Sequence, residues 1–452
     1  MAAQTINHSL HRRRTLARLG TLALSGWGAG CVQPPTRAPA APQADTAAGF
    51  RLAGEWEPVQ AMWLGYDPGH EAITAALALA LQPHVPLKLL ARDAAQVQAA
   101  RTLLAKAGVD VTAVEFMVDE LAIFFLRDAA VFTAGPAGRH GVVDFKWSQY
   151  GLAAWCARRH GTGSSQALER SAACAAEVDP ARDEQDRRIA RLARADVYRS
   201  PLALEGGGIE CNGRGVALVS AVLAQQRNPG RSLAEMEAEF LQLPGISKLI
   251  WLGEGLASDP HLRATITGPY VAWGTGGHTD EFVRFADART VLLAWPDDGD
   301  AAGHPVARLS RQRMARNFDI LAQAGDAQGA PFRIIKVPLP RAIERRVVLT
   351  AAADAGFSEQ WTADYFAPGE QRREGQALTQ VASASYLNFV LANGVVVLPG
   401  YEAHGTPRSV EARVGALFEQ AFPGRVIRFV NTLGLNWVGG GAHCATLSQP
   451  RA

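Results

Sequence analysis

Cysteine is scarce in this chain, and its spacing argues against two kinds of site. The 452 residues include five cysteines, at positions 31, 156, 174, 211 and 444. No two of them are separated by the two residues that zinc-binding and thioredoxin-like motifs use. The sequence therefore gives little support to a zinc site or to thioredoxin chemistry.

Strong charge and long apolar runs are also missing from most of the chain. The formal net charge is +2, and no strong basic run follows the N-terminus, so we expect no nucleic-acid partner. No interior apolar run reaches the roughly 20 residues of a membrane-spanning helix. With 48% hydrophobic and 19% charged residues, the composition is typical of a globular protein with one large or two ordinary domains.

The first 31 residues are typical of an export signal. Arg12-Arg13-Arg14 precedes an apolar, small-residue stretch over 16–30, as in a twin-arginine signal. Cys31 follows small residues, as at a bacterial lipoprotein site, so its lipidation would attach the protein to a membrane. Residues 32–48 are rich in Pro, Ala and Thr and predict a flexible tether, and 49–452 form the folded domain. We therefore expect an exported protein, either periplasmic or anchored as a lipoprotein.

Export would permit a disulfide bond in the folded part. Cys156 and Cys174 lie in a polar, helical segment that runs from about 152 to 195. A bond between them would close this excursion and stabilise the fold by about 3 kcal/mol at most. The alternative is that both are ordinary buried helix residues, and the sequence leaves the two open.

The order of elements predicts an α/β protein. The N-terminal part alternates between strand and helix: strand 61–66, helix 71–82, strand 86–90, helix 93–108 and strand 109–116. The same rhythm returns over 290–338, and Asn-Gly pairs at 212–213 and 393–394 predict two hairpins. No sequence repeat accompanies the recurring pattern.

The stretch 437–447, Trp-Val-Gly-Gly-Gly-Ala-His-Cys-Ala-Thr-Leu, is a candidate nucleophile loop. Consecutive glycines allow backbone angles and close approaches that other residues resist. They lead to the lone thiol of Cys444, which small residues follow. The stretch is also compatible with an inert, buried cysteine beside a glycine loop, because a reactive cysteine needs partners.

Two other stretches carry candidate partners. Gly276-Gly277 lead into His278 and Asp280, whose side chains would face the same side of a strand. A lone histidine is usually structural, but a His and an Asp on one face just after glycines are more often functional. Arg127-Asp128 lies inside an apolar run, either as a local ion pair at a strand end or as a carboxylate directed into a site.

Together these residues resemble the agmatine deiminase and bacterial-type peptidylarginine deiminase family of guanidine-modifying enzymes. The resemblance runs from about Glu55 to Pro450. It rests on seven motifs in family order: Glu55-Trp56-Glu57-Pro58, Arg127-Asp128, Glu205-Gly206-Gly207, Arg227-Asn228-Pro229, Gly277-His278-Thr279-Asp280 with Arg284-Phe285, Asn388-Phe389 with Asn393-Gly394, and Gly439 to Cys444. Each motif alone is weak, but the ordered set is specific.

The resemblance implies a fold and a site. The fold would be a five-bladed α/β propeller, or pentein, in which strand-and-helix units surround a central polar site. The domain 49–452 would then be a single deiminase catalytic domain. The implied catalytic residues are Cys444, His278, Asp128 and Asp280. The implied substrate-binding residues are Glu205, Phe125, Arg127 and Trp63.

The implied chemistry suits these residue types. Two carboxylates can hold a planar guanidinium by charge-assisted hydrogen bonds, so Asp128 and Asp280 would fix its carbon against the thiolate of Cys444. His278 would protonate the departing ammonia and then activate the hydrolytic water. Neither a metal nor an organic cofactor is needed. The substrate would be agmatine, giving N-carbamoylputrescine for putrescine biosynthesis, or arginine or an arginyl peptide, giving citrulline.

Two other classes of function compete with deimination. One is a non-catalytic propeller that binds guanidino ligands or serves as a surface lipoprotein, although a binding module has no need of a nucleophile. The other is a thiol hydrolase or amidotransferase, although an acyl substrate carries no cation for two carboxylates to hold. The sequence leaves the natural substrate and the oligomeric state open.

Overall fold

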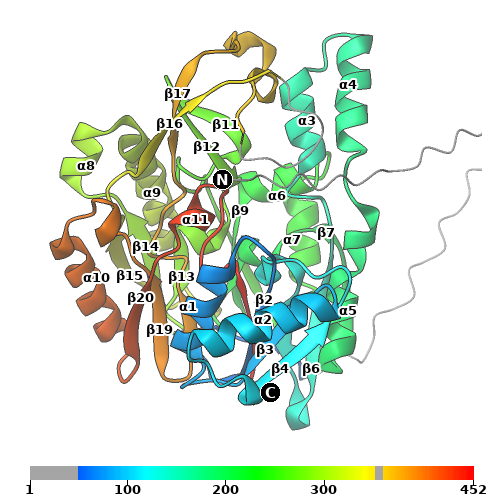
Figure 1. Ribbon diagram of the computed structural model, residues 1–452, viewed down its shortest axis with the longest axis vertical. Helices are drawn as coiled ribbons and strands as arrows, with labels where there is room; N and C mark the ends of the chain where they lie inside the picture. The colour runs from blue at the N-terminus through cyan, green and yellow to red at the C-terminus, as the bar shows by residue number, and fades with distance from the viewer. Residues whose placement is uncertain (1–48, 352–359) are drawn as a thin grey trace, which may run out of the picture. The chain divides into compact units, whose positions relative to one another are not determined.

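The computed structural model describes residues 49–351 and 360–452, which belong to one compact unit, Asp45–Ala452. The export signal, the tether and Cys31 lie outside the described residues. Within the described ranges, no helix combines the length and the apolar character that a membrane crossing requires. The fold is a mixture of strands and helices, as the element order predicted (Figure 1).

Five of the six sheets among the described residues share one strand pattern. In each, a short first strand pairs antiparallel with a second, and the second pairs parallel with a third. The first four are β5–β6–β7 (Val131–Ala134, His140–Lys146, Asp196–Ala203), β8–β9–β10 (Ile209–Cys211, Val216–Ser220, Lys248–Leu252), β13–β14–β15 (Val283–Phe285, Thr290–Trp295, Arg333–Pro338) and β18–β19–β20 (Val390–Ala392, Val395–Pro399, Val426–Val430). The fifth joins the two ends of the unit as β21–β2–β3–β4 (Thr446–Pro450, Val59–Gly65, Leu87–Ala91, Val114–Val118).

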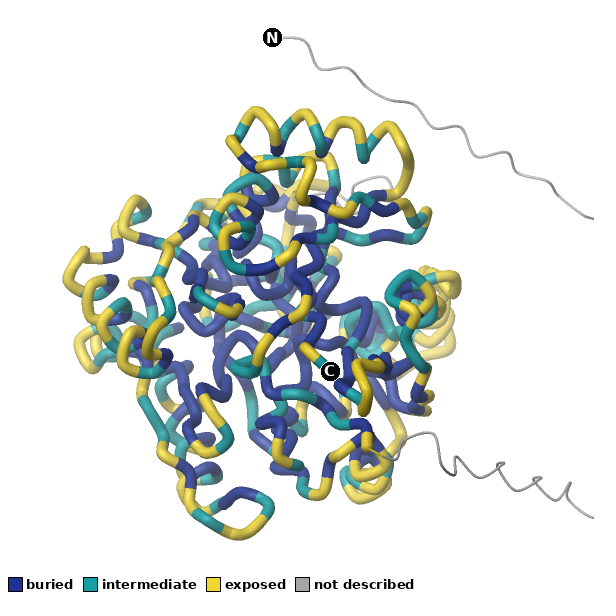
Figure 2. The backbone as a smooth tube through the Cα atoms, turned by 90° about the horizontal axis from the view of Figure 1, so that it is seen from below, coloured by how far each residue is buried: buried dark blue, intermediate teal, exposed yellow. Residues whose placement is uncertain are grey.

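Helices connect the parallel strands, because a parallel pair needs a crossover. They are α1 and α2 (Glu71–Leu81, Ala94–Lys106), α3 to α5 (Leu152–His160, Ser165–Ala175, Gln185–Ala193), α6 and α7 (Ala221–Arg227, Leu233–Phe240), α8 and α9 (Asp298–Gly303, Pro305–Gln323), and α10 (Arg408–Ala421). A short α11 (Leu433–Asn436) precedes the last loop. The second strands β9 and β19 are buried throughout, as their apolar sequences predict. Figure 2 shows the buried segments inside and the exposed helical surfaces at the periphery.

Local sequence signals account for several elements. Each Asn-Gly pair lies between two antiparallel strands, β8 with β9 and β18 with β19, which confirms both predicted hairpins. Ser232 and Glu235 form a reciprocal capping box at the start of α7. Asp93 caps α2 by accepting a hydrogen bond from the Gln96 amide.

The sixth sheet interrupts the regular pattern and lies beside α3 and α4 in Figure 1. Its strands, in sheet order, are β11 (His261–Thr267), β12 (Tyr270–Thr275), β17 (Ala377–Val381) and β16 (Glu344–Val348), and β1 (Arg51–Leu52) is a separate edge strand on β5. The indole of Trp155 in α3 donates to the Arg263 carbonyl of β11 at 3.0 Å. Cys156 in α3 and Cys174 in α4 form a disulfide with a Cα–Cα distance of 5.8 Å, which decides between the two alternatives that the sequence left open.

Candidate active site

The segment just before each first strand carries a polar side chain toward one buried site. Asp128 precedes β5, Glu205 precedes β8, Asp280 precedes β13, Asn388 precedes β18 and Cys444 precedes β21. All five are buried. The recurring sheet pattern therefore brings residues from five distant parts of the sequence into contact.

Short 3₁₀ helices set the direction of the acidic side chains. Asp128 lies in η2 (Leu126–Ala129), and Asp280 lies in η6 (Thr279–Glu281) with His278 as its N-cap residue. The expectation that His278 and Asp280 lie on a strand is therefore wrong. They still reach the same place, with His278 Nδ1 3.9 Å from Asp280 Oδ1, because the tight turn replaces the strand alternation.

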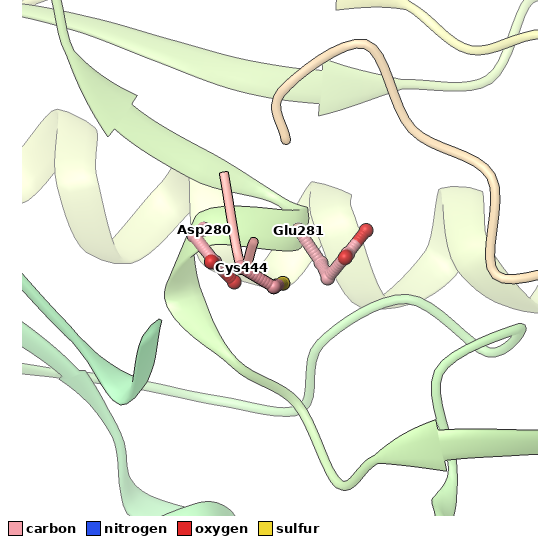
Figure 3. Close-up of side chains that lie close together, drawn as sticks. All are labelled: Asp280, Glu281 and Cys444. Carbon is pink, nitrogen blue, oxygen red and sulfur yellow. Dashed lines mark hydrogen bonds between the residues drawn. The ribbon is translucent and has the colours of Figure 1, made fainter. Parts of the chain in front are cut away.

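Cys444 is 1% exposed and lies among polar groups. The Asn388 amide donates to its Sγ at 3.2 Å, and its Sγ is 3.6 Å from Asp280 Oδ2. Figure 3 shows the sulfur between the carboxyl groups of Asp280 and Glu281. Burial, with these two acidic groups, raises the pKa of the Cys444 thiol well above its usual value. The thiol therefore needs a nearby positive charge to become a nucleophile.

The same three residues are the ones that could hold a metal ion. Within the described ranges, Asp280, Glu281 and Cys444 are the group whose ligand atoms lie within 4.8 Å of one another. The Glu281 carboxyl, however, has a pKa raised well above its usual value by burial and by Asp280. Because it accepts from the Asn388 amide at 2.9 Å, the neutral acid is already held in a hydrogen bond.

His278 lies at the centre of the acidic groups and is fully buried. Its Nε2 is 3.2 Å from Glu205 Oε2, and its Nδ1 is 3.8 Å from Asp128 Oδ1. Burial alone would lower its pKa, but Asp128, Glu205 and Asp280 outweigh that effect and raise the pKa to about 9. His278 is thus an imidazolium at neutral pH and can act as an acid.

Glu205 holds His278 through a buried ion pair. Its carboxylate also accepts from the Arg227 Nε at 2.8 Å. Burial would raise its pKa, but Arg227 and His278 lower it to about 2. Glu205 is therefore a permanent anion that orients the imidazole and supports its positive charge.

Asp128 and Asp280 each have an oxygen within 4 Å of the same atom, Nδ1 of His278. Its Oδ2 accepts a hydrogen bond from the Tyr150 hydroxyl at 2.8 Å, and its Oδ1 accepts a long one from the Gly207 amide at 3.4 Å. Burial raises its pKa to about 6, with contributions from Glu205 and Asp280. Two carboxylates around one buried imidazolium form an anionic site that suits a flat cation.

Three buried atoms of this site have no hydrogen-bond partner among the described residues. They are Nδ1 of His278, Oδ1 of Asp280 and Oε2 of Glu281. An unpaired buried polar atom is costly, so these atoms are available to hydrogen-bond a ligand. A donor group between the two carboxylates would satisfy Asp280.

Glycines allow the side chains to come this close. A Cβ at Gly207 would lie 2.6 Å from His278 Nδ1 and 3.0 Å from Asp280 Oδ2. A Cβ at Gly441 would lie 2.2 Å from Asn388 Oδ1, so the loop before Cys444 also needs glycine. The glycine-rich stretches noted in the sequence are therefore close approaches of backbone to functional groups.

A group of charged and polar residues outside the catalytic set contacts Asp280 through His443. His443 Nδ1 is 2.7 Å from Asp280 Oδ2, and its Nε2 is 2.8 Å from Glu55 Oε2. Glu55 also pairs with Arg127 and Arg284, each at 2.5 Å. Burial would raise the pKa of Asp280, but its hydrogen bond with His443 and the charges of both histidines lower it. Asp280 is therefore held as a carboxylate.

The structure brings the four predicted catalytic residues together, with Glu205 beside them. Phe125 is half-buried against the glycine loop, since a Cβ at Gly440 would lie 2.3 Å from its ring. Arg127 pairs with Glu55, which also contacts His443 behind Asp280. Trp63 is fully buried beside Phe132 and donates to Gln449. The roles of Arg127 and Trp63 in binding substrate stay predictions.

Sequence reasoning missed several residues of the site. Tyr150, Glu281, Asn388 and His443 were given no role. His443 and Glu281 are direct neighbours of predicted residues, and that adjacency was the available signal. Asn388 belongs to a family motif, but only the tertiary contact with the Cys444 sulfur reveals its function.

Comparisons with known proteins show the family and the fold of this chain. The family model described as Porphyromonas-type peptidyl-arginine deiminase matches residues 51–450. The agmatine deiminase of Ectopseudomonas mendocina is 27% identical over 424 residues, covering 90% of this chain and 97% of that protein. The same values hold for the agmatine deiminase of Pseudomonas aeruginosa. The solved agmatine deiminase of Enterococcus faecalis has the same fold, with a TM-score of 0.64, 22% identity, and coverage of 89% of this chain and 96% of that one.

Proposed function

The chain belongs to the Porphyromonas-type peptidyl-arginine deiminase family and is a hydrolase that acts on carbon–nitrogen bonds; from this premise we propose that it deiminates a guanidino group through a covalent intermediate on Cys444. One observation carries the proposal. The carboxylates of Asp128 and Asp280 flank the buried imidazolium of His278, beside the thiol of Cys444.

The first half of the reaction uses the charge of the substrate. A guanidinium bound between Asp128 and Asp280 brings a positive charge beside Cys444, which favours the thiolate. The thiol proton passes to solvent, and the sulfur attacks the central carbon and forms a C–S bond. His278 gives a proton to the departing nitrogen, the C–N bond breaks, and ammonia leaves.

The second half is hydrolysis. His278, now neutral, takes a proton from a water molecule, and the hydroxide attacks the carbon of the intermediate. The C–S bond breaks, the sulfur takes the proton of the added hydroxyl so that Cys444 is restored as a thiol, and a ureido product leaves. One water is consumed and one ammonia released, and the reaction draws on no metal or organic cofactor.

The recurring sheets support a more specific fold. We propose that the five sheets with one strand pattern are the five blades of a pentein propeller, with the first strand of each blade facing the centre. The position of the site residues just before the five first strands supports this arrangement. The domain over 49–452 would then be a single catalytic domain.

Agmatine is the first candidate substrate, because both curated relatives above are named agmatine deiminases. An arginyl peptide is the second, from the description of the family model and from the export signal. Protein lacking residues 1–48 should be incubated with agmatine, free arginine and an arginyl peptide, with Cys444→Ala as the blank. Ammonia and ureido product from one of them supports the proposal. Saturable binding without turnover of any of them would favour a non-catalytic guanidino-binding protein instead.

We also propose that the protein is exported, through residues 1–31, and anchored by lipid on Cys31. Arg12–Arg14 and the apolar stretch after them support this, since a cytoplasmic enzyme of polyamine synthesis needs no such signal. The enzyme would then meet external guanidino compounds. Cell fractionation and sequencing of the mature N-terminus test this. Protein found only in the cytosol with its first residues intact would refute export.

A further inference from the structure

Tyr150 touches the reaction centre but has no step in the proposed mechanism. Its hydroxyl donates to Asp128 Oδ2 at 2.8 Å, and its ring centroid is 6.1 Å from that of His278. It is half-buried, whereas His278 is fully buried and Asp128 nearly so. Of these three residues, Tyr150 is the most exposed.

An unusual backbone holds the tyrosine there. Gln149, Tyr150 and Gly151 are consecutive left-handed residues, with φ of 50°, 57° and 71°. Left-handed backbone is uncommon for residues other than glycine and persists only where contacts enforce it. The Tyr150 carbonyl is 2.8 Å from His261 Nε2 of β11. Burial, with Arg227 and Arg158, lowers the pKa of His261 to about 3, so a neutral imidazole donates this hydrogen bond.

Helix α3 also holds the Tyr150 loop next to β11, because it bonds to both. It begins directly after Gly151, and its first amides bond back to the loop, Leu152 N to Ser148 O at 3.1 Å and Trp155 N to Gly151 O at 3.2 Å. Arg158 on the same helix donates to the His261 carbonyl at 2.8 Å.

The disulfide joins this helix to α4. Cys156 directly follows Trp155, which bonds to both the loop and β11, and precedes Arg158, which bonds to β11. The cluster around the bond is small, with Leu152 and Trp155 as its other buried members. A small cluster depends more on a covalent link than a large core does. The bond between Cys156 and Cys174 thus supports the helix that positions Tyr150.

We propose that Tyr150 is a positioning residue for Asp128, and that the disulfide-bonded hairpin of α3 and α4 sets its position. The inference rests on the proposed function. One oxygen of Asp128 accepts from Tyr150, which orients the carboxylate and leaves its other lone pairs for the guanidinium. Reduction of the disulfide would weaken substrate binding without changing Cys444 or His278 directly.

The charge around Asp128 provides a readout that a purely structural role would not move. His278, Glu205 and Asp280 face Asp128, and Arg227 lies 5.9 Å from the Tyr150 ring. Because the Tyr150 hydrogen bond favours the carboxylate, its loss should raise the pKa of Asp128 further. The acid limb of kcat/KM would then move to higher pH.

The first test is Tyr150→Phe, with Tyr365→Phe as the matched control, since Tyr365 packs on Trp155 of the same helix. In Tyr150→Phe we expect the acid limb of kcat/KM to rise by about one pH unit, as for a lost hydrogen bond to a charged group. KM should rise severalfold, with a smaller change in kcat. Wild-type KM and an unmoved acid limb would overturn the proposal.

The second test concerns the disulfide and uses the folded wild-type enzyme with and without a phosphine reductant. Reduction should raise KM and move the acid limb in the same direction as Tyr150→Phe, and should add little to that variant. The Cys156→Ser/Cys174→Ser variant should have the KM and the acid limb of the reduced enzyme, and the reductant should change neither. If that variant does not fold, the reduced wild-type enzyme still tests the role of the disulfide. Circular dichroism then shows whether the reduced enzyme has kept its fold. An unchanged KM after verified reduction would overturn the role of the hairpin.

These results are distinct from a failure of the proposed function. A wild-type enzyme that releases no ammonia from any guanidino substrate refutes deimination itself. An active wild type whose kinetics do not respond to Tyr150→Phe refutes only the positioning role.

Discussion

His443 Nδ1 lies 2.7 Å from Oδ2 of Asp280, and this contact joins the residue before the nucleophile to a carboxylate of the site. The opposite ring nitrogen faces Glu55 at 2.8 Å. Burial would raise the pKa of Asp280, but its hydrogen bond with His443 opposes that effect and helps to lower the pKa. The loop that carries Cys444 thus helps to keep the neighbouring carboxylate of Asp280 ionised and oriented.

Replacing His443 by Asn should weaken this support. The variant loses a charge-assisted hydrogen bond to Asp280, worth about 1.5–3 kcal/mol, so kcat/KM should fall roughly tenfold to a hundredfold. Steady-state kinetics and thermal unfolding measure the two consequences. His404→Asn, at a partly exposed histidine that faces Asn431, is the control and should keep wild-type kinetics. Equal kinetics in both variants would contradict a supporting role for His443.

Removal of the nucleophile should abolish turnover while the fold persists. Cys444→Ala loses only the sulfur from a site held by many other contacts, so we expect a fall in kcat of at least about 10⁴-fold and a nearly unchanged melting temperature. Cys211→Ala is the matched control at the other free cysteine of the described residues. Substantial ureido formation by Cys444→Ala would contradict the covalent mechanism.

The two carboxylates should each be essential to binding the cation. Asp128→Asn and Asp280→Asn keep the shape and remove the charge, so each should cost several kcal/mol of transition-state stabilisation, or about 10²-fold or more in kcat/KM. Asp287→Asn, at an exposed turn, should have no effect. Near wild-type kinetics in either site variant would mean that the guanidinium is bound elsewhere.

A methyl group at Gly207 should displace catalytic side chains and so lower activity. In Gly207→Ala the added carbon would lie 2.6 Å from His278 Nδ1 and 3.2 Å from Asp128 Oδ1. A Cβ does not approach another atom as closely as 2.6 Å, so His278 must move, and the contact with Asp128 would be tight. We expect at least about a hundredfold loss of kcat/KM. Gly299→Ala meets nothing within 4 Å and should be silent. An active Gly207→Ala enzyme would show that this spacing is not needed.

The pH profile of kcat/KM should be bell-shaped. Asp128, with its pKa raised to about 6, must be ionised to hold a cation, so activity should fall as the pH drops through about 6. His278, with its pKa raised to about 9, must be protonated to release ammonia, so activity should fall as the pH rises through about 9. The alkaline limb should move in a Glu205→Gln variant to lower pH, because His278 loses an anionic partner. A flat profile between pH 5 and 10 would contradict these assignments.

Much of the architecture could be predicted from local sequence signals. The alternation of strands and helices, the Asn-Gly hairpins and the capping box at Ser232 depend on near neighbours, so they can be recognised without tertiary contacts. The family motifs also allowed Cys444, His278, Asp128 and Asp280 to be singled out together.

Tertiary structure decided which way the side chains point. Nothing local indicates that Arg127 turns to Glu55 while its neighbour Asp128 turns to His278, because that choice depends on a partner 72 residues earlier and another 150 residues later, counted from the residue numbers. Trp63 likewise is a strand residue whose face is settled by Phe132 and Gln449.

The sequence by itself determined the element types, the glycine-rich approaches and the chemistry of the nucleophile, because these follow from local propensity and residue type. Only the tertiary structure decided the charge state of the site. Burial and the mutual proximity of Asp128, Glu205, Asp280 and His278 shift their pKa values in opposite directions, and those distances exist only after the five first strands come together.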